Sequence, residues 1–315
     1  MRHLRRHVEG LARVDPADSG GISPLLRIKI APPIPAVNPL PRPDLVSKLM
    51  DPGWKVCLIS APAGWGKTSV IAGWHAMESD SGRFAFLRLE EQDDDGPLFW
   101  TYVIAALRTV HAALMAGTDE VLRTPGMSPM RQAVPQLINE LAVIEEPTVL
   151  VLDDYHLVRS EEIHSSVQHL IDHLPPHLRL VIATRLDPPL PLSRLRASGA
   201  MLEVRAGGLG FSNVEAVEFL NRRFGIDLDS PSAARLRQRT EGWPAGLQLA
   251  GLSLVGEPDP QGFVARFAGD DRNVANYLIS EVFRSVTAEQ RDFLLRTSVL
   301  DRLTACLLYT SDAAD

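Results

Sequence analysis

The residues best suited to chemistry form the segment APAGWGKT at positions 61–68. A short apolar run at 55–60 precedes this segment, and residues 69–77 carry apolar side chains at helical spacing. A glycine-rich turn that joins a strand to a helix and ends in Lys-Thr is typical of a phosphate-binding loop. The sequence therefore predicts a site for a nucleoside triphosphate.

Within this loop, Gly64 and Gly66 would let backbone N–H groups turn inward around phosphate oxygens, and the following helix would add the positive end of its dipole. Lys67 would reach the β- and γ-phosphates, and the Thr68 hydroxyl would hold Mg²⁺. The first position holds Ala61 where glycine is usual, which is acceptable if its φ is negative. We expect nucleotide contacts from the following loop residues: Ala63, Gly64, Trp65, Gly66, Lys67, Thr68 and Ser69.

A second motif, TVLVLDD at residues 148–154, places two carboxylates after an apolar run. A buried central strand with this ending would bring its acids beside the phosphate loop. Asp153 would hold Mg²⁺, directly or through water, and Asp154 would orient or deprotonate the attacking water. The alternative is a strand with acids at its exposed end. The pairing with the phosphate loop favours the catalytic interpretation.

Two arginines are further candidates. Arg185 follows the apolar run at 178–184, where it could stabilise transition-state charge or distinguish triphosphate from diphosphate. Arg42 precedes the first strand, in a segment expected to lie over the nucleotide base. Contact with the adenine side and a plain surface position are both open for Arg42.

Other charged groups have simpler explanations. The acidic run at 90–95 follows a predicted strand and could touch Mg²⁺ or water, but a solvated turn with charge at a helix N-terminus is the expected role. His169 and His173 share one helix face and could bind a metal, yet no third ligand is apparent, so solvated histidines are expected.

The elements that must position these residues follow an α/β order. Apolar runs alternate with helical patterns, which predicts a five-stranded parallel doubly wound sheet of the P-loop NTPase type. A strand between the two motif strands indicates the additional-strand class of these ATPases. After about residue 208 the pattern is all helical, with capping boxes at Ser212–Glu215 and Thr287–Gln290. The expected strands are 55–60, 83–89, 148–153, 178–184 and 200–205.

Composition excludes several classes of protein. The chain of 315 residues has 45% hydrophobic and 23% charged residues, which is ordinary for a soluble protein of two domains. A net charge of −7 argues against a surface that coats nucleic acid. No apolar stretch approaches the ~20 residues of a membrane span. Its two cysteines give no disulfide framework, and a reduced cytoplasmic location is expected.

In combination, several motifs resemble the N-terminal half of MalT-like regulators, the large ATP-binding LuxR-type transcription factors of the STAND ATPase class. The resemblance spans roughly residues 28 to 305. The segments that carry it are APAGWGKT, TVLVLDDYHLV, LVIATRLDPPLPLSRLRASG, FSNVEAVEFL, TEGWPAGLQLAGLSL and FLLRTSVLDRLT.

The resemblance implies a nucleotide-binding domain at 25–207, then a helical lid and the start of a winged-helix domain at 208–305. It also implies that Gly242-Trp243-Pro244 forms a turn on the adenine side, with Pro244 as a nucleotide contact, although Trp243 could equally be plain core. Residues 1–24 are expected to be a disordered leader. Residues 306–315 depart from the family pattern and look like a translated sequencing adapter.

The leading functional hypothesis is therefore a switch that binds ATP or ADP with Mg²⁺ and hydrolyses ATP slowly. In the family, an inducer and DNA are bound by regions that this segment does not include, and self-association can follow ATP binding. The alternatives are a stand-alone P-loop ATPase or phosphotransferase, whose output is turnover, and a scaffold that binds nucleotide without hydrolysis.

Overall fold

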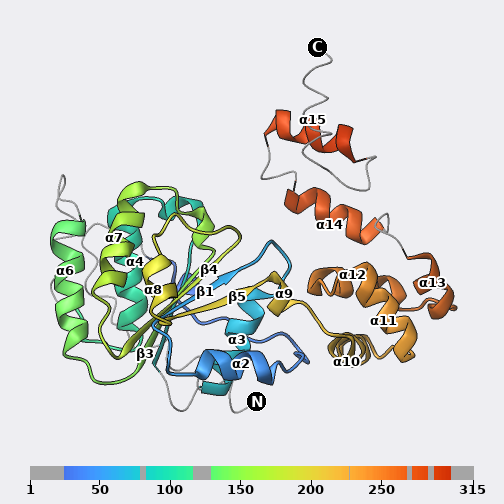
Figure 1. Ribbon diagram of the computed structural model, residues 1–315, viewed down its shortest axis with the longest axis horizontal. Coiled ribbons are helices and arrows are strands. Elements are labelled where there is room, and N and C mark those ends of the chain that lie inside the picture. Colours follow the sequence, from blue (N-terminus) through green and yellow to red (C-terminus); the bar gives the residue numbers. More distant parts are fainter. Residues whose placement is uncertain are drawn as a thin grey trace. The chain divides into compact units, whose positions relative to one another are not determined.

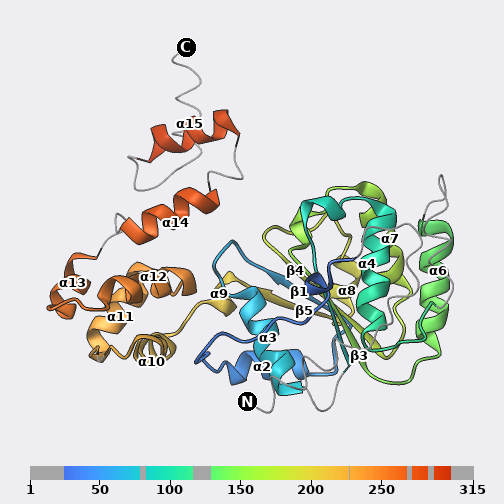
Figure 2. The ribbon, with the colours of Figure 1, turned by 180° about the vertical axis from the view of Figure 1, so that it is seen from behind.

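The computed structural model describes residues 25–78, 83–115, 129–226, 228–267, 272–282 and 287–298 (Figures 1 and 2). By the proximity of their Cα atoms, the residues divide into two compact units. Of the described residues, the first unit comprises 25–35, Asp44–Ser60 and Thr68–Val204. The second unit comprises Ala36–Pro43, Ala61–Lys67 and the described residues from Arg205 to 298. The first seven residues of the predicted phosphate loop thus cluster with the C-terminal helices.

The first unit is built on a five-stranded sheet with the order β2-β3-β4-β1-β5. The β2–β3, β3–β4 and β1–β4 pairs are parallel. Because β4 lies between the two motif strands β1 and β3, the predicted additional-strand order is confirmed. The strands are β1 (Val56–Ser60), β2 (Arg83–Arg88), β3 (Thr148–Asp153), β4 (Leu178–Thr184) and β5 (Met201–Arg205), each within one residue of the expected bounds.

Every residue of β1 and β3 is buried, as expected of central parallel strands covered on both faces. Helices α4 (Gly96–Arg108), α6 (Pro129–Ala142) and α7 (Glu161–Asp172) lie side by side on one flank of the sheet in both ribbon views. Alternate strand residues such as Leu58 and Leu150 join these helices in one apolar core. Helices α2 (Pro43–Met50) and α3 (Lys67–Glu78), with the short α8 (Ser193–Ala197), complete the unit.

Helix α6 was not expected from the sequence. It contains Pro135 in its interior, and a proline at an interior position usually indicates a kink or the end of a helix. Its inward side chains nevertheless pack fully, since Val134 and Leu137 have no exposed surface. Tertiary burial here outweighs local propensity.

The described part of the second unit is helical after β5. Both predicted capping boxes are present, at the N-terminal ends of α10 and α15. A separate core of leucine, alanine, valine and phenylalanine side chains holds α10 to α14 together. The helices are α9 (Ala206–Leu209), α10 (Asn213–Phe224), α11 (Ser230–Arg239), α12 (Pro244–Leu254), α13 (Pro260–Arg266), α14 (Arg272–Val282) and α15 (Ala288–Thr297).

Three expectations stay predictions. The leader at 1–24 and the adapter-like end at 306–315 lie outside the described residues. The described helices α14 and α15 do not define a winged-helix domain.

Within the described ranges, no helix is long and apolar enough to cross a lipid bilayer.

Candidate functional site

The predicted phosphate loop has a backbone conformation that suits phosphate binding. Strand β1 ends at Ser60 and α3 begins at Lys67, so the loop joins a strand to a helix N-terminus as predicted. Gly64 and Gly66 have φ angles of 75° and 78°, a left-handed conformation that favours glycine. Ala61 is not among the residues with positive φ, so alanine is tolerated at that position.

The Lys67 side chain lies along its own loop. Its Nζ donates hydrogen bonds to the carbonyl oxygens of Ala61 at 2.7 Å and Pro62 at 3.1 Å. Only 8% of the residue is exposed. The ammonium group is therefore held at the loop, where a phosphate-binding cation is needed.

Within the second unit, the segment that starts α12 contacts this loop. Trp243 Nε1 donates to the carbonyl oxygen of Ala63 at 3.1 Å, and the backbone N of Ala245 donates to that of Gly64 at 3.1 Å. A Cβ on Gly64 would lie 2.6 Å from the Cβ of Ala245, so only glycine fits there. Trp243 is half-buried and also packs against the apolar core of the second unit, so a core role and a loop contact are both present.

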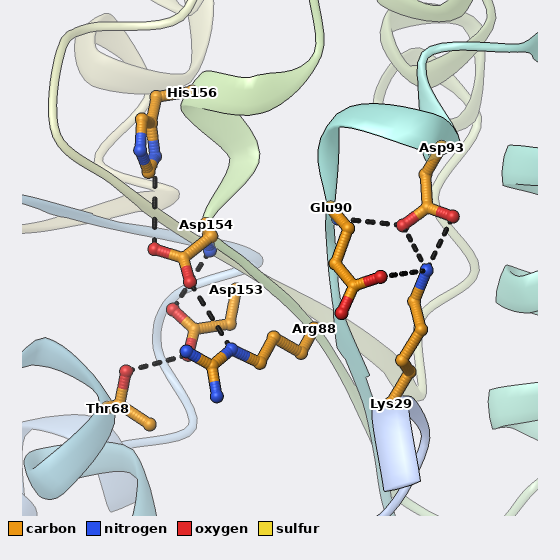
Figure 3. A network of polar contacts seen from close by, with 8 residues as sticks. All are labelled: Lys29, Thr68, Arg88, Glu90, Asp93, Asp153, Asp154 and His156. Carbon is orange, nitrogen blue, oxygen red and sulfur yellow. Dashed lines mark hydrogen bonds and ion pairs between the residues drawn. The ribbon is translucent and has the colours of Figure 1, made fainter. Parts of the chain in front are cut away.

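The two residues expected to hold Mg²⁺, Thr68 and Asp153, lie side by side in the first unit, as Figure 3 shows. The Thr68 hydroxyl donates to Asp153 Oδ2 at 2.7 Å, and Asp153 Oδ1 accepts from the backbone N of Asp154 at 3.0 Å. Asp153 is fully buried at the carboxyl end of β3. Hydroxyl and carboxylate oxygens are the ligands that Mg²⁺ prefers, so this donor set fits the expected ion.

Asp154 lies between two basic side chains (Figure 3). Its backbone has a φ of 58°, which turns the chain out of β3 into a short 3₁₀ segment. Arg88 Nε lies 3.5 Å from Asp154 Oδ2, and His156 Nδ1 lies 3.9 Å from Oδ1. The Arg88 side chain is 64% exposed, so this ion pair is a weak surface pair.

Sequence reasoning missed both Arg88 and His156. A signal was available for Arg88, because the carboxyl ends of parallel strands align at one edge of a sheet. Arg88 is the last residue of β2 and is paired in register with Asp153.

The acidic run is the expected solvated turn only in part: Glu90, Glu91 and Asp95 are exposed, but Asp93 is not. Asp93 is fully buried and receives a hydrogen bond from Lys29 Nζ, 2.6 Å from its Oδ1. Lys29 is 3% exposed, lies 4.1 Å from the centre of the Tyr102 ring and is 3.6 Å from Glu90 Oε2. Figure 3 shows this cluster beside the loop that follows β2. The physical reason is that the segment before the first strand folds over this loop and brings a cation to it.

The neighbouring acids also have structural roles. Asp94 Oδ1 accepts from the backbone N of Arg159 at 2.8 Å and of Ser160 at 2.7 Å. Asp95 caps the N-terminus of α4 by accepting from the backbone N of Leu98. The expected charge at a helix N-terminus is therefore present at Asp95, and the two Asp94 bonds hold the loop after β2 to the loop after β3.

The two candidate arginines differ in their surroundings. Arg42 donates to the carbonyl oxygen of Leu209 at 2.8 Å, and its Nε lies 2.6 Å from Glu215 Oε1. Burial lowers the pKa of Arg42, an effect that Glu215 opposes. Arg185 directly follows β4 and is partly buried.

Two further sequence candidates, Ser69 and Pro244, lie at the N-terminal ends of helices. Ser69 is exposed in the first turns of α3, and Pro244 is the first residue of α12. His173 Nδ1 lies 2.9 Å from the carbonyl oxygen of His169, and the centroids of the two imidazole rings are 4.5 Å apart. In the part of the chain that the structure describes, no group of three or more His, Cys, Asp or Glu side chains could hold a metal ion.

Comparisons with known proteins bear on this arrangement. No family model matches the sequence. The HTH-type transcriptional regulator MalT of Serratia proteamaculans is 32% identical over 287 residues, which is 90% of this chain and 31% of that protein. MalT of Yersinia enterocolitica is 32% identical over 288 residues, or 90% of this chain and 32% of that protein. The chain thus spans about a third of the length of these curated relatives.

A solved structure agrees on the fold. The Walker-type ATPase PABY2304 of Pyrococcus abyssi matches with a TM-score of 0.51 at 15% sequence identity. The match covers 82% of this chain and 77% of that protein. Over nine tenths of its length, the chain is therefore homologous to one part of the MalT-type transcriptional regulators, and its sheet has the P-loop ATPase fold.

Proposed function

We propose that this chain is the ATP-binding, slowly hydrolysing switch module of a LuxR/MalT-type transcriptional regulator that works in the cytoplasm. The observation that supports this best is the 2.7 Å hydrogen bond between Thr68 and Asp153. These residues are 85 positions apart, and the sheet brings together the two oxygens that a magnesium nucleotide requires.

Each residue has a distinct role in this proposal. The N–H groups of Ala63–Ser69 and the Lys67 ammonium bind the phosphates. Thr68 and Asp153 hold Mg²⁺, which neutralises phosphate charge when bound. Asp154 orients the attacking water or takes its proton. Arg185 stabilises charge that develops at the γ-phosphate. Arg42 and Pro244 are proposed contacts on the adenine side.

The output of the module is a change of state rather than a product. ATP and ADP differ by one phosphoryl group, so each can favour a different conformation of the protein that binds it. In the intact regulator, the ATP state together with an inducer would favour self-association and transcription activation. The relatives are named HTH-type regulators, and we propose that DNA and the inducer are bound by regions outside this chain.

The test is nucleotide binding and turnover by the purified chain, beside Lys67→Ala and Asp154→Ala. We expect tight binding of Mg-ATP or ADP with turnover below about one per minute, against a typical enzyme kcat of about 10 s⁻¹. Lys67→Ala should lose the nucleotide, whereas Asp154→Ala should keep it and stop hydrolysis.

Other results would favour the rival functions. Turnover of many per second would indicate an ATPase or phosphotransferase whose purpose is catalysis. Binding without any hydrolysis would indicate a nucleotide scaffold. A folded chain that binds no nucleotide would overturn the proposal.

A further inference from the structure

We propose that Trp243 and Ala245 are positioning residues of the phosphate loop. They hold the loop by its carbonyl oxygens and thereby aim the N–H groups of Gly64 and Trp65 at a bound phosphate. The inference rests on the proposed nucleotide binding and deepens it, because it assigns the orientation of two loop donors to residues of the C-terminal helices.

Two hydrogen bonds carry the argument. The Trp243 indole N–H reaches the carbonyl oxygen of Ala63, and the Ala245 backbone N–H reaches that of Gly64, both at 3.1 Å. Trp243 is the N-cap of α12 and Ala245 is its second residue. The N–H groups in the first turn of a helix have no acceptor within that helix. The Gly64 carbonyl supplies the missing acceptor, so this contact satisfies the helix as well as the loop.

Because a peptide group is planar, a hydrogen bond that fixes the direction of its C=O also fixes the direction of its N–H. The Ala63 carbonyl and the Gly64 N–H belong to one peptide group, and the Gly64 carbonyl and the Trp65 N–H belong to the next. No peptide bond in the described residues is cis. In a planar trans peptide the C=O and N–H bonds point in opposite directions. Donors that hold both carbonyls on one side of the loop therefore leave both N–H groups facing the other side.

The loop conformation lets these N–H groups act together. Gly64 and Gly66 both have positive φ, and left-handed residues beside right-handed ones make successive N–H groups converge on an anion. A phosphate oxygen is the ligand that such a concavity takes.

The indole ring is closely fitted. A Cβ on Gly64 would lie 2.8 Å from Trp243 Nε1, and a Cβ on Gly246 would lie 2.6 Å from Trp243 Cε3. Glycines thus contact the ring near both ends, and Tyr277 contacts it with a centroid separation of 5.5 Å. The N–H donor is therefore held in place before any ligand binds, which reduces the ordering cost of binding.

Trp243→Phe tests the inference, because it keeps an aromatic ring and removes the N–H donor. Dissociation of a fluorescent ADP analogue from the full chain should become about three- to tenfold faster, the effect of losing one net hydrogen bond. The turnover number should change less than twofold. The matched control is Trp54→Phe, since Trp54 Nε1 donates at 3.2 Å to the carbonyl oxygen of Lys48, a residue of α2. The control should leave dissociation unchanged.

Two further measurements separate the role of the N–H group from a general loss of structure. Trp243→β-(3-benzothienyl)alanine keeps the ring shape and replaces N–H by sulfur, so it should reproduce the faster dissociation even if Trp243→Phe unfolds. In the nucleotide-free chain labelled with ¹⁵N-tryptophan, the indole proton of Trp243 should exchange with solvent more slowly than that of an exposed indole.

The outcomes distinguish a failure of the positioning role from a failure of the proposed function. Equal dissociation rates for the wild type and both position-243 variants, or fast exchange of the indole proton, would overturn the positioning role and leave the proposed function intact. Failure of the folded wild-type chain to bind the ADP analogue would overturn the proposed function and this inference together.

Discussion

Replacing Lys29 by methionine should strongly destabilise the first unit, although Lys29 lies outside the sheet and outside every motif. The change keeps the length of the side chain and removes the cation from a fully buried Asp93. Breaking a buried ion pair by removing one partner costs about 3–5 kcal/mol, because the other charge stays buried without compensation. Asp93 Oδ2 also accepts from the backbone N of Glu90 at 2.8 Å, which favours the lower part of this range.

Urea unfolding followed by far-ultraviolet circular dichroism measures this cost. Lys48→Met is the matched control, because Lys48 is an exposed lysine of α2 and its replacement should change the free energy of unfolding by less than about 0.5 kcal/mol. Hydrogen exchange of residues 83–93 should also become faster in Lys29→Met, since the ion pair holds the loop that follows β2.

A double mutant distinguishes a buried charge from simple packing. In Lys29→Met/Asp93→Asn neither buried charge remains, and the asparagine oxygen can still accept from the Glu90 N–H. The double mutant should therefore be more stable than the sum of the single mutants predicts, by about 1–3 kcal/mol. A cost below about 1 kcal/mol for Lys29→Met, or strict additivity, would refute the reasoning.

Three other predictions concern charge and backbone strain. Arg88→Ala should cost less than about 1 kcal/mol and change turnover at most about fivefold, since its pair with Asp154 is an exposed one; steady-state kinetics and urea unfolding check both values. Burial lowers the pKa of His164, so below about pH 6.5 this imidazole is protonated more in the unfolded chain than in the folded chain. Stability should fall as the pH decreases from 7 to 5.5, and His164→Phe should reduce this slope in unfolding experiments. Gly242→Ala should destabilise the chain more than Gly225→Ala does: both have positive φ, but only at Gly242 would a Cβ lie 2.6 Å from a backbone carbonyl oxygen, and thermal unfolding compares them.

Local chemistry made several features predictable from sequence. The phosphate loop must have glycines, lysine and threonine at fixed spacing, because one backbone turn has to surround a phosphate. Apolar runs of strand length that end in acids or in this loop indicate parallel strands, and their alternation with helices indicates a doubly wound sheet. The capping boxes before α10 and α15 could be predicted for the same reason, since each involves residues only three positions apart.

The contacts of Lys29, Arg88 and Trp243 could not be predicted in this way. Lys29 and Asp93 are 64 residues apart, and the Trp243 indole meets a carbonyl 180 residues away. The hydrophobic periodicity of a single helix or strand does not predict a contact between such distant residues. The contact depends on strand register and on how segments fold back on one another.

The sequence by itself determined the type of sheet and the position of the glycine-rich loop between β1 and α3, and it supplied the residues proposed for phosphate and magnesium binding, because those requirements are met within a few consecutive residues. Only the tertiary structure decided which groups surround those residues. It buried Asp93 against Lys29, placed Arg88 beside Asp154 and put the Trp243 indole on the phosphate loop. These contacts join residues that are far apart in the sequence. Burial of apolar surface offsets the conformational entropy that is lost when such residues are brought together, and no local sequence pattern reports it.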